Sequence, residues 1–562
     1  MGMHMDISGI YCFQAERHGV CLLPKAIKKQ CDEREHMLLF SGSLFNMTEE
    51  ALLDGLIEKG CDFVKELNGV FAFCYWDESS LMLARDHMGV KPLYYAVEQD
   101  RIIFGSKPGG LFELGVKPAV DQQGLRELFA LGPAHTPGSC VYSGVQELLP
   151  GEFLLASPDG ITKTTYWRLE SRPHTDSFED TVETVAQLVK NSVERQMETN
   201  APLCAFLSGG LDSSIVTAIG AKKLARQGKR LRTFSFDFDG NDEFYQSHAF
   251  QPSRDAPYAL EMAEYLDTEH VQLTCSHTQL ADLLDDAMEA RDMPGMADID
   301  ASLLYFCGIA GKTHKVALTG ECADEVFGGY PWFRSEEALD CRTPLGTFPW
   351  SRDHAARRTL LRDDVLDELQ LEEYAGAACE ASVAETPRLP GENPREARRR
   401  EIAWLNLRWF MQTLLARMDC CAGAAGMEAR VPFADIRLLE YVWNIPWEMK
   451  YQEGHAKYLL RAAGQNRLSG QNLLPDSVLW RKKSPYPKTY HPQYAAILAE
   501  RLRDILNDPN QPLHRFVDKR KAEEFLKQPP EHGAPWYGQL MAAPQRVAWF
   551  LQINAWMRKY RL

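Results

Sequence analysis

The chain lacks the features that mark membrane, secreted and disulfide-rich proteins. No apolar run in its 562 residues approaches the length that spans a bilayer, and the opening residues have no basic stretch followed by an apolar core. The 14 cysteines include no CxxC pair, and the neighbours Cys420 and Cys421 do not have metal-ligand spacing either. We therefore expect a cytoplasmic protein without a membrane segment or secretory signal, with reduced and mostly buried thiols.

Acidic residues outnumber basic ones, 78 to 62. The formal net charge is −16, so we expect no nucleic-acid partner. One arginine-rich segment, TPRLPGENPREARRR (386–400), stands out. We interpret it as an exposed loop that enters a helix with a solvated basic face. The sequence also contains no internal repeat and no low-complexity tract.

The first domain, residues 1–166, has a β-rich pattern. VFAFCYWDESSLMLARD (70–86) predicts two strands joined by a short polar turn, and RIIFGS (101–106) predicts another strand. EEALLDGLIEKG (49–60) predicts an amphipathic helix that ends at its glycine. The polar stretch at 167–180 predicts a linker.

Strands alternate with helices in the second domain, residues 181–562. The apolar segments that we expect to be strands lie at 203–207, 230–238, 268–274 and 315–320. Helical patterns separate them, and the chain is mostly helical from about residue 400 onward. This alternation predicts βαβ units and an open, doubly wound parallel sheet, with a helical carboxyl-terminal part.

The segment FLSGGLDSS (206–214) carries the strongest chemical signal. An apolar strand ends there, glycines let backbone N–H groups approach a ligand, and the next helix amino terminus favours negative charge. We predict a phosphate cradle, although no Gly-Lys-Ser/Thr makes it a Walker A loop. Asp212 fits such a site if it holds Mg²⁺, and the alternative is a capping bond at the helix start. The cradle residues are Ser208, Gly209, Gly210, Ser213 and Ser214.

Two further motifs fit the same site. LTGECADEVFGGY (318–330) follows another apolar strand, and ligands bind beyond the carboxyl ends of strands in open α/β sheets. Its carboxylates Glu321, Asp324 and Glu325 either raise one another's pKa or bind a cation; the alternative is a solvated acidic helix start. VLWRKKSPYP (478–487) alone is an ordinary basic loop. Beside a phosphate cradle it is a candidate clamp for a leaving polyphosphate.

In this order, the three motifs resemble the glutamine-dependent, two-domain asparagine synthetases. SGGLDSS resembles the pyrophosphate motif, and GECADEVFGGY resembles Gly-Glu-x-x-Asp-Glu-x-x-Gly-Gly-Tyr. GMEARVPFAD (426–435) and WRKKSPYPKT resemble two further segments of the family. LNGVFAFCYWD and LARDHMGVKPLYY (83–95) resemble its glutaminase domain. The resemblance implies an α+β N-terminal-nucleophile fold, a β-sandwich flanked by helices, followed by an α/β ATP pyrophosphatase domain.

The resemblance also implies a reaction. A carboxylate attacks the α-phosphorus of Mg-ATP, pyrophosphate leaves, and ammonia or another amine attacks the acyl-adenylate. Asp212 and Asp324 would lie near magnesium, and Lys483 would neutralise the leaving pyrophosphate. Glu321 would orient or deprotonate the nitrogen, and a base of this kind contributes roughly 10²–10⁴-fold. The residues implied to bind the nucleotide and the acyl-adenylate are Leu207, Ser208, Gly209, Gly210, Asp212, Ser213, Ser214, Phe236, Gly320 and Tyr330.

The first domain departs from the family at the glutamine site. The family needs a cysteine directly after the initiator Met, whereas position 2 here is Gly. Aligning SGIYCF, from the opening MGMHMDISGIYCF, puts Ser8 at the nucleophile without a free α-amine. The family's Arg-Gly-Pro-Asp is absent from the chain. The family's Asn-Gly-Glu-x-Tyr-Asn stands here as SGSLFN (41–46), so Ser41 and Ser43 replace the Asn and the Glu. We expect that glutamine hydrolysis is lost and that the domain is retained for structure.

A second departure concerns the carboxylate substrate. Where the family has Asp-Arg-x-Ser-Met, this chain has DCCAGAAG (419–426), so Cys420, Ala422 and Gly423 replace a cation, a hydroxyl and a Met. If the segment lines the acyl pocket, the substrate differs from aspartate. Three hypotheses follow: an ammonia-dependent asparagine synthetase, a synthetase like the lasso-peptide cyclases and β-lactam synthetases, and a non-catalytic ATP-binding protein. The intact motifs favour the first, and a homodimer is among the assemblies left open.

Overall fold

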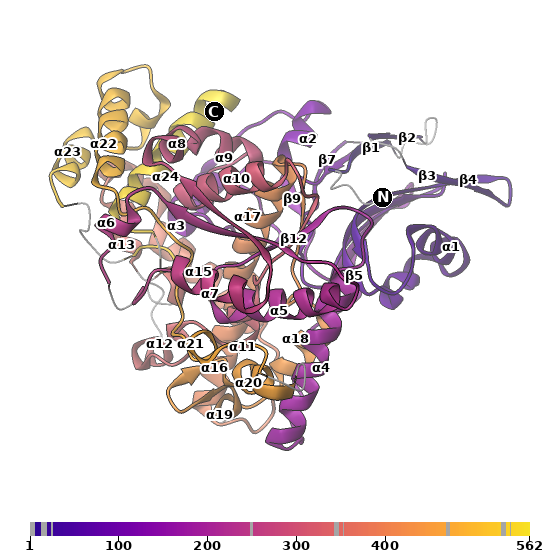
Figure 1. The fold of residues 1–562 in the computed structure, drawn as a ribbon. Helices are drawn as coiled ribbons and strands as arrows, with labels where there is room; N and C mark the ends of the chain where they lie inside the picture. The colour runs from indigo at the N-terminus through magenta and orange to yellow at the C-terminus, as the bar shows by residue number, and fades with distance from the viewer. Residues whose placement is uncertain are drawn as a thin grey trace. The chain divides into compact units, whose positions relative to one another are not determined.

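The computed structural model describes residues 6–12, 19–23, 26–99, 101–247, 251–341, 348–351, 353–467, 472–529, 535–539 and 541–562. The chain forms two compact units, which are coloured along the sequence in Figure 1. The first comprises residues 1–127 and 135–169, and the second comprises 128–134 and 170–562. Residues 1–5 and 13 of the opening stretch lie outside the described residues.

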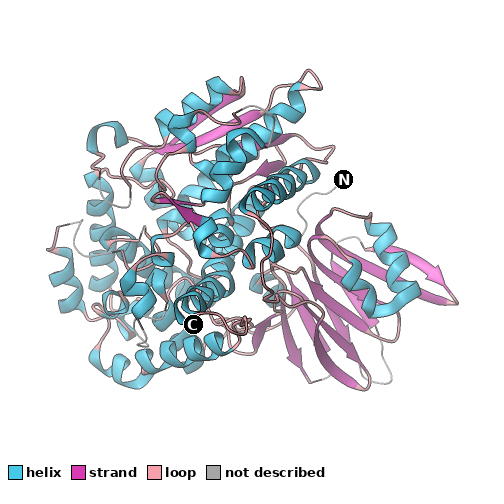
Figure 2. Cartoon of the chain, turned by 90° about the horizontal axis from the view of Figure 1, so that it is seen from below, coloured by secondary structure: helices cyan, strands magenta, loops and turns pink. Residues whose placement is uncertain are grey.

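The first unit contains two antiparallel sheets, drawn in magenta in Figure 2. One sheet has the strand order β2-β1-β8-β7-β9, and the other has the order β11-β10-β6-β5-β4-β3. The strands are β1 (Ser8–Cys12), β2 (Gly19–Leu23), β3 (Ile27–Cys31), β4 (Arg34–Leu44), β5 (Gly69–Trp76), β6 (Leu81–Arg85), β7 (Tyr94–Glu98), β8 (Arg101–Gly105), β9 (Val145–Glu147), β10 (Glu152–Ser157) and β11 (Gly160–Thr165). The predicted strands at 70–86 and 101–106 are therefore confirmed.

The core of the first unit lies between the two sheets. Tyr11 and Phe104 from one sheet pack with Leu39 and Leu83 from the other, and all four are fully buried. Helix α1 (Glu49–Lys59) covers the outer face of the second sheet with its apolar side, and it ends at Gly60 as predicted. The predicted strands and helix thus form the layers observed in this unit: two sheets packed face to face as a β-sandwich, with helices at its outside.

The second unit is built on one parallel sheet with the strand order β14-β13-β12-β15-β16. Figure 1 shows α5 and α7 on one side of these strands and α9 and α10 on the other, which is the doubly wound arrangement predicted. The strands are β12 (Leu203–Phe206), β13 (Arg232–Phe238), β14 (Glu269–Cys275), β15 (Val316–Leu318) and β16 (Glu428–Arg430). The main helices are α4 (Phe178–Gln196), α5 (Leu211–Ala225), α7 (Ala256–Tyr265), α8 (His277–Asp282), α9 (Leu284–Arg291), α10 (Asp298–Ala310), α11 (Ala323–Phe327), α15 (Leu371–Ala384), α16 (Pro394–Leu405), α17 (Met411–Ala424), α18 (Ile436–Trp443), α20 (Tyr458–Ala462), α21 (Asp476–Leu479), α22 (Pro492–Asn507) and α24 (Ala543–Tyr560).

Two details differ from the sequence analysis. The short strand β16 adds a fifth member to the sheet, and three residues are too few to give a readable period. The arginine run was expected to be a solvated face, which is wrong. Arg398 is buried and pairs with Glu401 at 2.9 Å, and Arg400 pairs with Glu392 at 2.7 Å. Internal carboxylates neutralise these arginines, so the helix can bury them.

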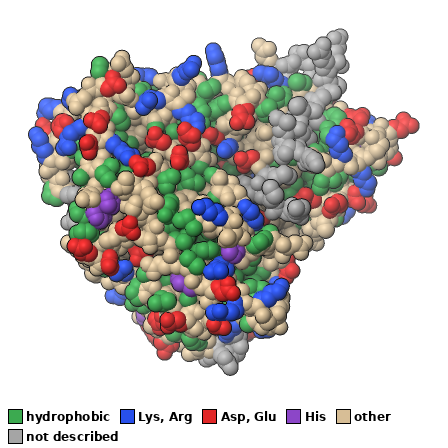
Figure 3. Space-filling model, turned by 45° about the horizontal axis from the view of Figure 1, so that its top comes forward, with side chains coloured by type: hydrophobic (Ala, Val, Ile, Leu, Met, Phe, Trp, Pro, Cys, Tyr) green, Lys and Arg blue, Asp and Glu red, His purple; other side chains and the backbone are tan. Residues whose placement is uncertain are grey.

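In the face drawn in Figure 3, acidic and basic side chains are intermixed. The cysteines that the structure describes are free thiols, most of them buried. In the described part of the chain, no helix has both the length and the apolar character needed to cross a membrane.

Candidate active site

A solvent-open pocket of about 1350 Å³ lies in the second unit, at the carboxyl ends of β12, β13 and β15. Segments far apart in the sequence complete its wall: helix α17, the start of α20, and the loop after α21. The pocket brings together most of the residues chosen from the sequence, namely Leu207, Ser208, Gly210, Asp212, Ser213, Phe236, Gly320, Glu321, Asp324, Tyr330 and Lys483. The three motifs therefore meet at one place, as their positions after strands suggested.

The loop between β12 and α5 has the form expected of an anion cradle. The Ser208 backbone N–H donates to the Ser213 Oγ at 3.2 Å, and the two hydroxyl oxygens lie 2.9 Å apart. Helix α5 begins after Gly210, and no side chain of the described residues caps its amino terminus. Its first backbone N–H groups and its dipole are therefore available to an anion in the pocket.

Two cradle residues from the sequence lie behind this surface and do not line the pocket. Gly209 has a φ of +69°, and a Cβ there would come within 2.4 Å of the Ala259 backbone nitrogen. Its carbonyl accepts a hydrogen bond from the Arg481 guanidinium at 3.1 Å. Ser214 is fully buried in the first turn of α5. Gly209 therefore permits the tight turn, and Ser214 lies where it cannot reach a ligand in the pocket.

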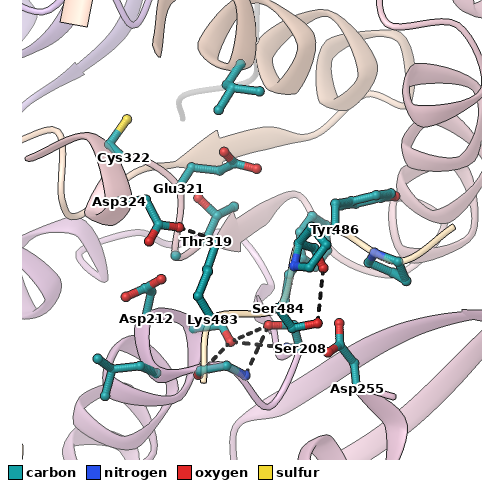
Figure 4. A pocket seen from close by; sticks show the side chains of 18 of the residues that line it. Ser208, Asp212, Asp255, Thr319, Glu321, Cys322, Asp324, Lys483, Ser484 and Tyr486 are labelled. Atoms are coloured by element: carbon teal, nitrogen blue, oxygen red, sulfur yellow. Dashed lines mark hydrogen bonds and ion pairs between the residues drawn. The ribbon is translucent and has the colours of Figure 1, made fainter. Parts of the chain in front are cut away.

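Two carboxylates and two ammonium groups of the pocket lining form an ionic cluster, of which Figure 4 labels Asp212, Asp324 and Lys483. The Lys457 Nζ lies 2.6 Å from an oxygen of Asp212 and 2.6 Å from an oxygen of Asp324. The Lys483 Nζ lies 2.7 Å from the other oxygen of Asp324. Asp212 is thus paired with a cation in the pocket.

The charges in this cluster stabilise one another. Burial alone would raise the pKa of Asp324, but Lys457 and Lys483 hold that pKa well below its usual range. Asp212 has one ammonium partner, and burial raises its pKa in spite of Lys457. Burial alone would lower the pKa of Lys483, yet Asp324 and Asp212 keep that pKa above its ordinary value. Lys483 therefore remains a cation inside the pocket.

Glu321 has a partner of its own. The Arg417 Nη2, from helix α17, donates to the Glu321 Oε1 at 2.7 Å, and the Arg417 side chain is only 3% exposed. The structure records this bond at one oxygen of Glu321, whose side chain is 19% exposed and lines the pocket. The Glu321 carboxylate is therefore fixed in position while remaining accessible to a small molecule in the pocket.

Glu325 and Tyr330 form a buried pair on the same wall. The Tyr330 hydroxyl donates to the Glu325 Oε1 at 2.6 Å, and the Tyr330 ring stacks on Trp332. Burial, assisted by the nearby charge of Asp324, raises the pKa of Glu325 to about 8. The motif thus contains one strongly ionised carboxylate, Asp324, which two lysines stabilise, and one buried carboxyl group, Glu325, which holds its proton near neutral pH.

The segment DCCAGAAG contributes no described residue to the lining of the pocket. Helix α17 contributes Leu414, Arg417 and Met418 to the lining, whereas Cys420, Ala422 and Gly423 are absent from the lining among the residues that the structure describes. The departures from the family pattern lie on the following turn of the helix.

Sequence reasoning missed several cations of the pocket. Lys457 begins α20 in a left-handed conformation with a φ of +56°, and it lies 245 residues from Asp212 in the sequence. Arg481 was quoted in the basic loop, but its partner Asp255, at 2.6 Å, was not identified. Arg417 lies in an apolar helix with no motif around it. The one available signal was that a buried helix carries an arginine, which calls for a partner.

The first unit holds Ser8 inside its sheet. Ser8 begins β1 and pairs with Leu23 on one side and Gly105 on the other. The preceding Ile7 is fully buried, and its backbone N–H donates to the Ser106 Oγ at 2.9 Å. Ile7 is therefore bound into the unit, and the Ser8 nitrogen is an amide.

Two known protein families match the chain, one in each of its units. The asparagine synthase family model matches residues 184–558, and the glutamine amidotransferase domain model matches residues 33–167. The chain is 44% identical over 518 residues to asparagine synthetase [glutamine-hydrolyzing] 3 of Bacillus subtilis, covering 91% of this chain and 82% of that protein. It is 26% identical over 528 residues to asparagine synthetase [glutamine-hydrolyzing] 1 of the same organism, covering 85% and 79% respectively.

The asparagine synthase match covers most of the second unit, including the residues that line the pocket. The similarity to asparagine synthetase 3 extends along most of both chains. The family resemblance and the fold inferred from the sequence are thereby confirmed. The chain belongs to the asparagine synthase family, whose members are ligases that form amides with ATP.

Proposed function

We propose that the protein converts aspartate and ammonia to asparagine, with ATP cleaved to AMP and pyrophosphate. The observation that carries the proposal is the convergence in one pocket of an uncapped helix amino terminus, the cluster of Asp212, Asp324, Lys457 and Lys483, and the carboxylate of Glu321. These are the groups that adenylation of a carboxylate and attack by an amine require. The relatives named above are asparagine synthetases, which supports aspartate as the substrate.

The carboxylates fit a divalent cation. Asp212 and Asp324 each lie 2.6 Å from the same ammonium group of Lys457, so both reach one cation position. No cluster of three or more His, Cys, Asp or Glu side chains occurs in the described part of the chain. Mg²⁺ takes one or two carboxylates and completes its shell with phosphate oxygens and water, so two are sufficient. Bound there, Mg²⁺ would neutralise charge on the phosphates.

In the first step, the reacting carboxylate oxygen of aspartate attacks the α-phosphorus, and the bond to the pyrophosphate oxygen breaks. The amino terminus of α5 and the hydroxyls of Ser208 and Ser213 hold the pyrophosphate. Lys483 donates to the leaving group and offsets its growing negative charge. Phe236 and Leu207 contribute apolar surface for the adenine.

In the second step, ammonia attacks the acyl carbon, and the bond from that carbon to the AMP oxygen breaks. Glu321 accepts a hydrogen bond from the nitrogen and takes the proton that the nitrogen loses. Arg417 holds one oxygen of Glu321 and leaves the carboxylate oriented for this role.

We further propose that the first unit does not hydrolyse glutamine. The α-amine that a terminal nucleophile uses is replaced at Ser8 by a peptide bond, and the preceding Ile7 is buried. Ser41 and Ser43, which replace the glutamine-binding Asn and Glu, lie in strand β4. A hydroxyl is shorter than either side chain and carries no charge for the α-amine of glutamine.

The other hypotheses have less support. The residues that favoured a lactam- or peptide-forming synthetase, Cys420, Ala422 and Gly423, do not line the pocket within the described part of the chain. A non-catalytic ATP-binding protein does not require the paired Glu321 and Arg417. The deciding experiment measures pyrophosphate and asparagine with ATP, Mg²⁺ and aspartate, with ammonium or glutamine as donor. No asparagine and no pyrophosphate with ammonium would refute the proposal.

A further inference from the structure

A second, smaller cleft lies next to the active-site pocket. It has a volume of about 530 Å³, and residues of α11, α16, α18 and α19 (Trp447–Lys450) contribute to its lining. Helix α11 takes part in both walls: Asp324 lines the active-site pocket, Val326 lines the second cleft, and Glu325 lines both. The second cleft is thus a neighbour of the proposed active site, and the chemistry proposed above does not use it.

Two cations of the second cleft are neutralised within the protein. The Arg400 Nη2 lies 2.7 Å from the Glu392 Oε1, and the Arg400 Nε donates to both oxygens of Glu392 at 3.0 Å. Arg399 pairs with Glu396 on the same helix. These two ion pairs together add no net charge to the lining.

Lys450 is a third cation and has no carboxylate of its own. Its side chain is half-buried and lines the second cleft, and its Nζ forms neither a hydrogen bond nor an ion pair with the residues that the structure describes. Burial, and then the charge of Arg400, lowers the pKa of Lys450 to about 7, in spite of Glu396 and Glu392. Glu325 is not among the groups that act on this pKa. The lining therefore carries one positive site that an anionic ligand can stabilise.

The other walls of the second cleft are largely apolar. The rings of Phe333 and Trp447 stack with their centres 6.1 Å apart, and the Arg399 guanidinium lies 5.2 Å from the centre of the Trp447 ring. Leu407 and Ile445 add aliphatic surface. Such walls favour a hydrocarbon group, and a small hydrated anion such as phosphate would lose water there without a gain.

Trp447 links the second cleft to α11. Gly328 ends this helix with a φ of +71°, and a Cβ there would come within 2.6 Å of the Trp447 ring. The indole therefore packs directly on the end of the helix that carries Asp324. A ligand held against Trp447 and Val326 would restrict the motion of α11.

We propose that the second cleft is a regulatory site for a small apolar monocarboxylate. The carboxylate binds Lys450, and the hydrocarbon part lies against Trp447. Occupancy orders α11 and raises the affinity of the active-site pocket for Mg-ATP. Binding at the second cleft is independent of the proposed function, whereas its effect on Mg-ATP rests on that function. Free carboxylic acids and apolar amino acids share this chemistry, and the amino acids have in addition an ammonium group for Glu396.

The first test measures binding to the full chain by isothermal titration calorimetry, with 4-methylpentanoate and leucine as probes. The two differ only in the ammonium group, so the tighter of them distinguishes a free acid from an amino acid. 4-Methylpentanamide keeps the hydrocarbon part without the charge, and acetate keeps the charge without the hydrocarbon part. We expect millimolar binding of at least one probe, and binding of the amide and of acetate that is at least about tenfold weaker.

Substitution of Lys450 locates the binding. Lys450→Met removes the charge and keeps the length of the side chain, so it should weaken binding of the better probe on the order of 10- to 100-fold. Lys450→Gln repeats the measurement if Lys450→Met does not fold. Lys229→Met is the matched control, because Lys229 is exposed and is not part of the lining; it should bind the probe as the wild type does.

The second test measures the affinity for Mg²⁺ with a non-hydrolysable ATP analogue. A saturating concentration of the probe should tighten binding of the analogue at least about threefold, and the analogue should tighten binding of the probe by the same factor. In Lys450→Met this effect should be absent at the same concentration of probe.

Equal binding of the amide and the carboxylates, or unchanged binding in Lys450→Met, would overturn the inference. Displacement of the probe by the ATP analogue would also overturn it, because the probe would then occupy the active-site pocket. An unchanged affinity for the analogue would overturn the regulatory role. Failure of the proposed function gives a different result: the wild type would form no asparagine, while the probe would still bind in a manner that depends on Lys450.

Discussion

Replacing Lys457 with Met tests the central ion cluster. The substitution keeps the length of the side chain and removes the cation that lies 2.6 Å from both Asp212 and Asp324. With an effective dielectric constant near 20, each contact has a gross attraction of about 6 kcal/mol. The cost of burying the lysine offsets much of this, and removing one partner from a buried ion pair costs about 3–5 kcal/mol. We expect urea unfolding to show a loss of that size at neutral pH.

Magnesium provides a second readout of the same variant. If Asp212 and Asp324 hold Mg²⁺, the ion can take the place of the missing ammonium group. Millimolar Mg²⁺ should therefore stabilise Lys457→Met more than it stabilises the wild type, by the linkage between binding and folding. Lys482→Met is the matched control, because Lys482 lines the same pocket but is exposed. A loss below about 1 kcal/mol, or an equal response to Mg²⁺ in both proteins, would refute the reasoning.

Three further predictions have defined outcomes, the first of them with a matched control substitution. Gly209→Ala should lower the free energy of unfolding in urea by about 2–4 kcal/mol, because its Cβ would meet backbone atoms at 2.4 and 2.5 Å. Gly228→Ala is the control: its φ is +71° but its surroundings are open, so the loss should be about 1 kcal/mol. Burial raises the pKa of Asp298 to about 6 in the folded protein, from 3.8 in the unfolded chain. The protonated carboxyl group therefore contributes its full stability below pH 3.8, and this stability is lost as the pH rises through 6. Asp298→Asn should therefore gain up to about 3 kcal/mol over the wild type at pH 8 and little at pH 4, and a pH-independent difference would contradict this. Ser8→Ala should leave asparagine formation from ammonium unchanged in a steady-state assay; a large loss would assign Ser8 a role that the account denies.

The sequence was sufficient to bring Asp212, Asp324 and Glu321 to one site. Each follows an apolar strand, and the carboxyl ends of parallel strands meet at one edge of the sheet. The same rule located the cradle at the start of α5, because glycines and serines between a strand and a helix have a recognisable pattern. Local sequence patterns thus predict the residues of the site that lie at the carboxyl ends of the strands.

The partners of these residues could not be predicted in the same way. Lys457 comes from a short helix 245 residues after Asp212, and Arg417 comes from a helix whose apolar pattern gives no sign of a ligand. Their contacts depend on how the carboxyl-terminal helices pack on the sheet, which no local periodicity encodes. The arginine run failed for a related reason: Glu401 and Glu392, which neutralise it, become its neighbours only once the helices fold.

The most direct test of the account is a single comparison of nitrogen donors. Purified protein is incubated with ATP, Mg²⁺ and aspartate, with either ammonium or glutamine, and asparagine, glutamate and pyrophosphate are quantified. The account predicts asparagine and equimolar pyrophosphate with ammonium, and neither glutamate nor asparagine with glutamine. Glutamate release together with asparagine formation from glutamine would contradict it.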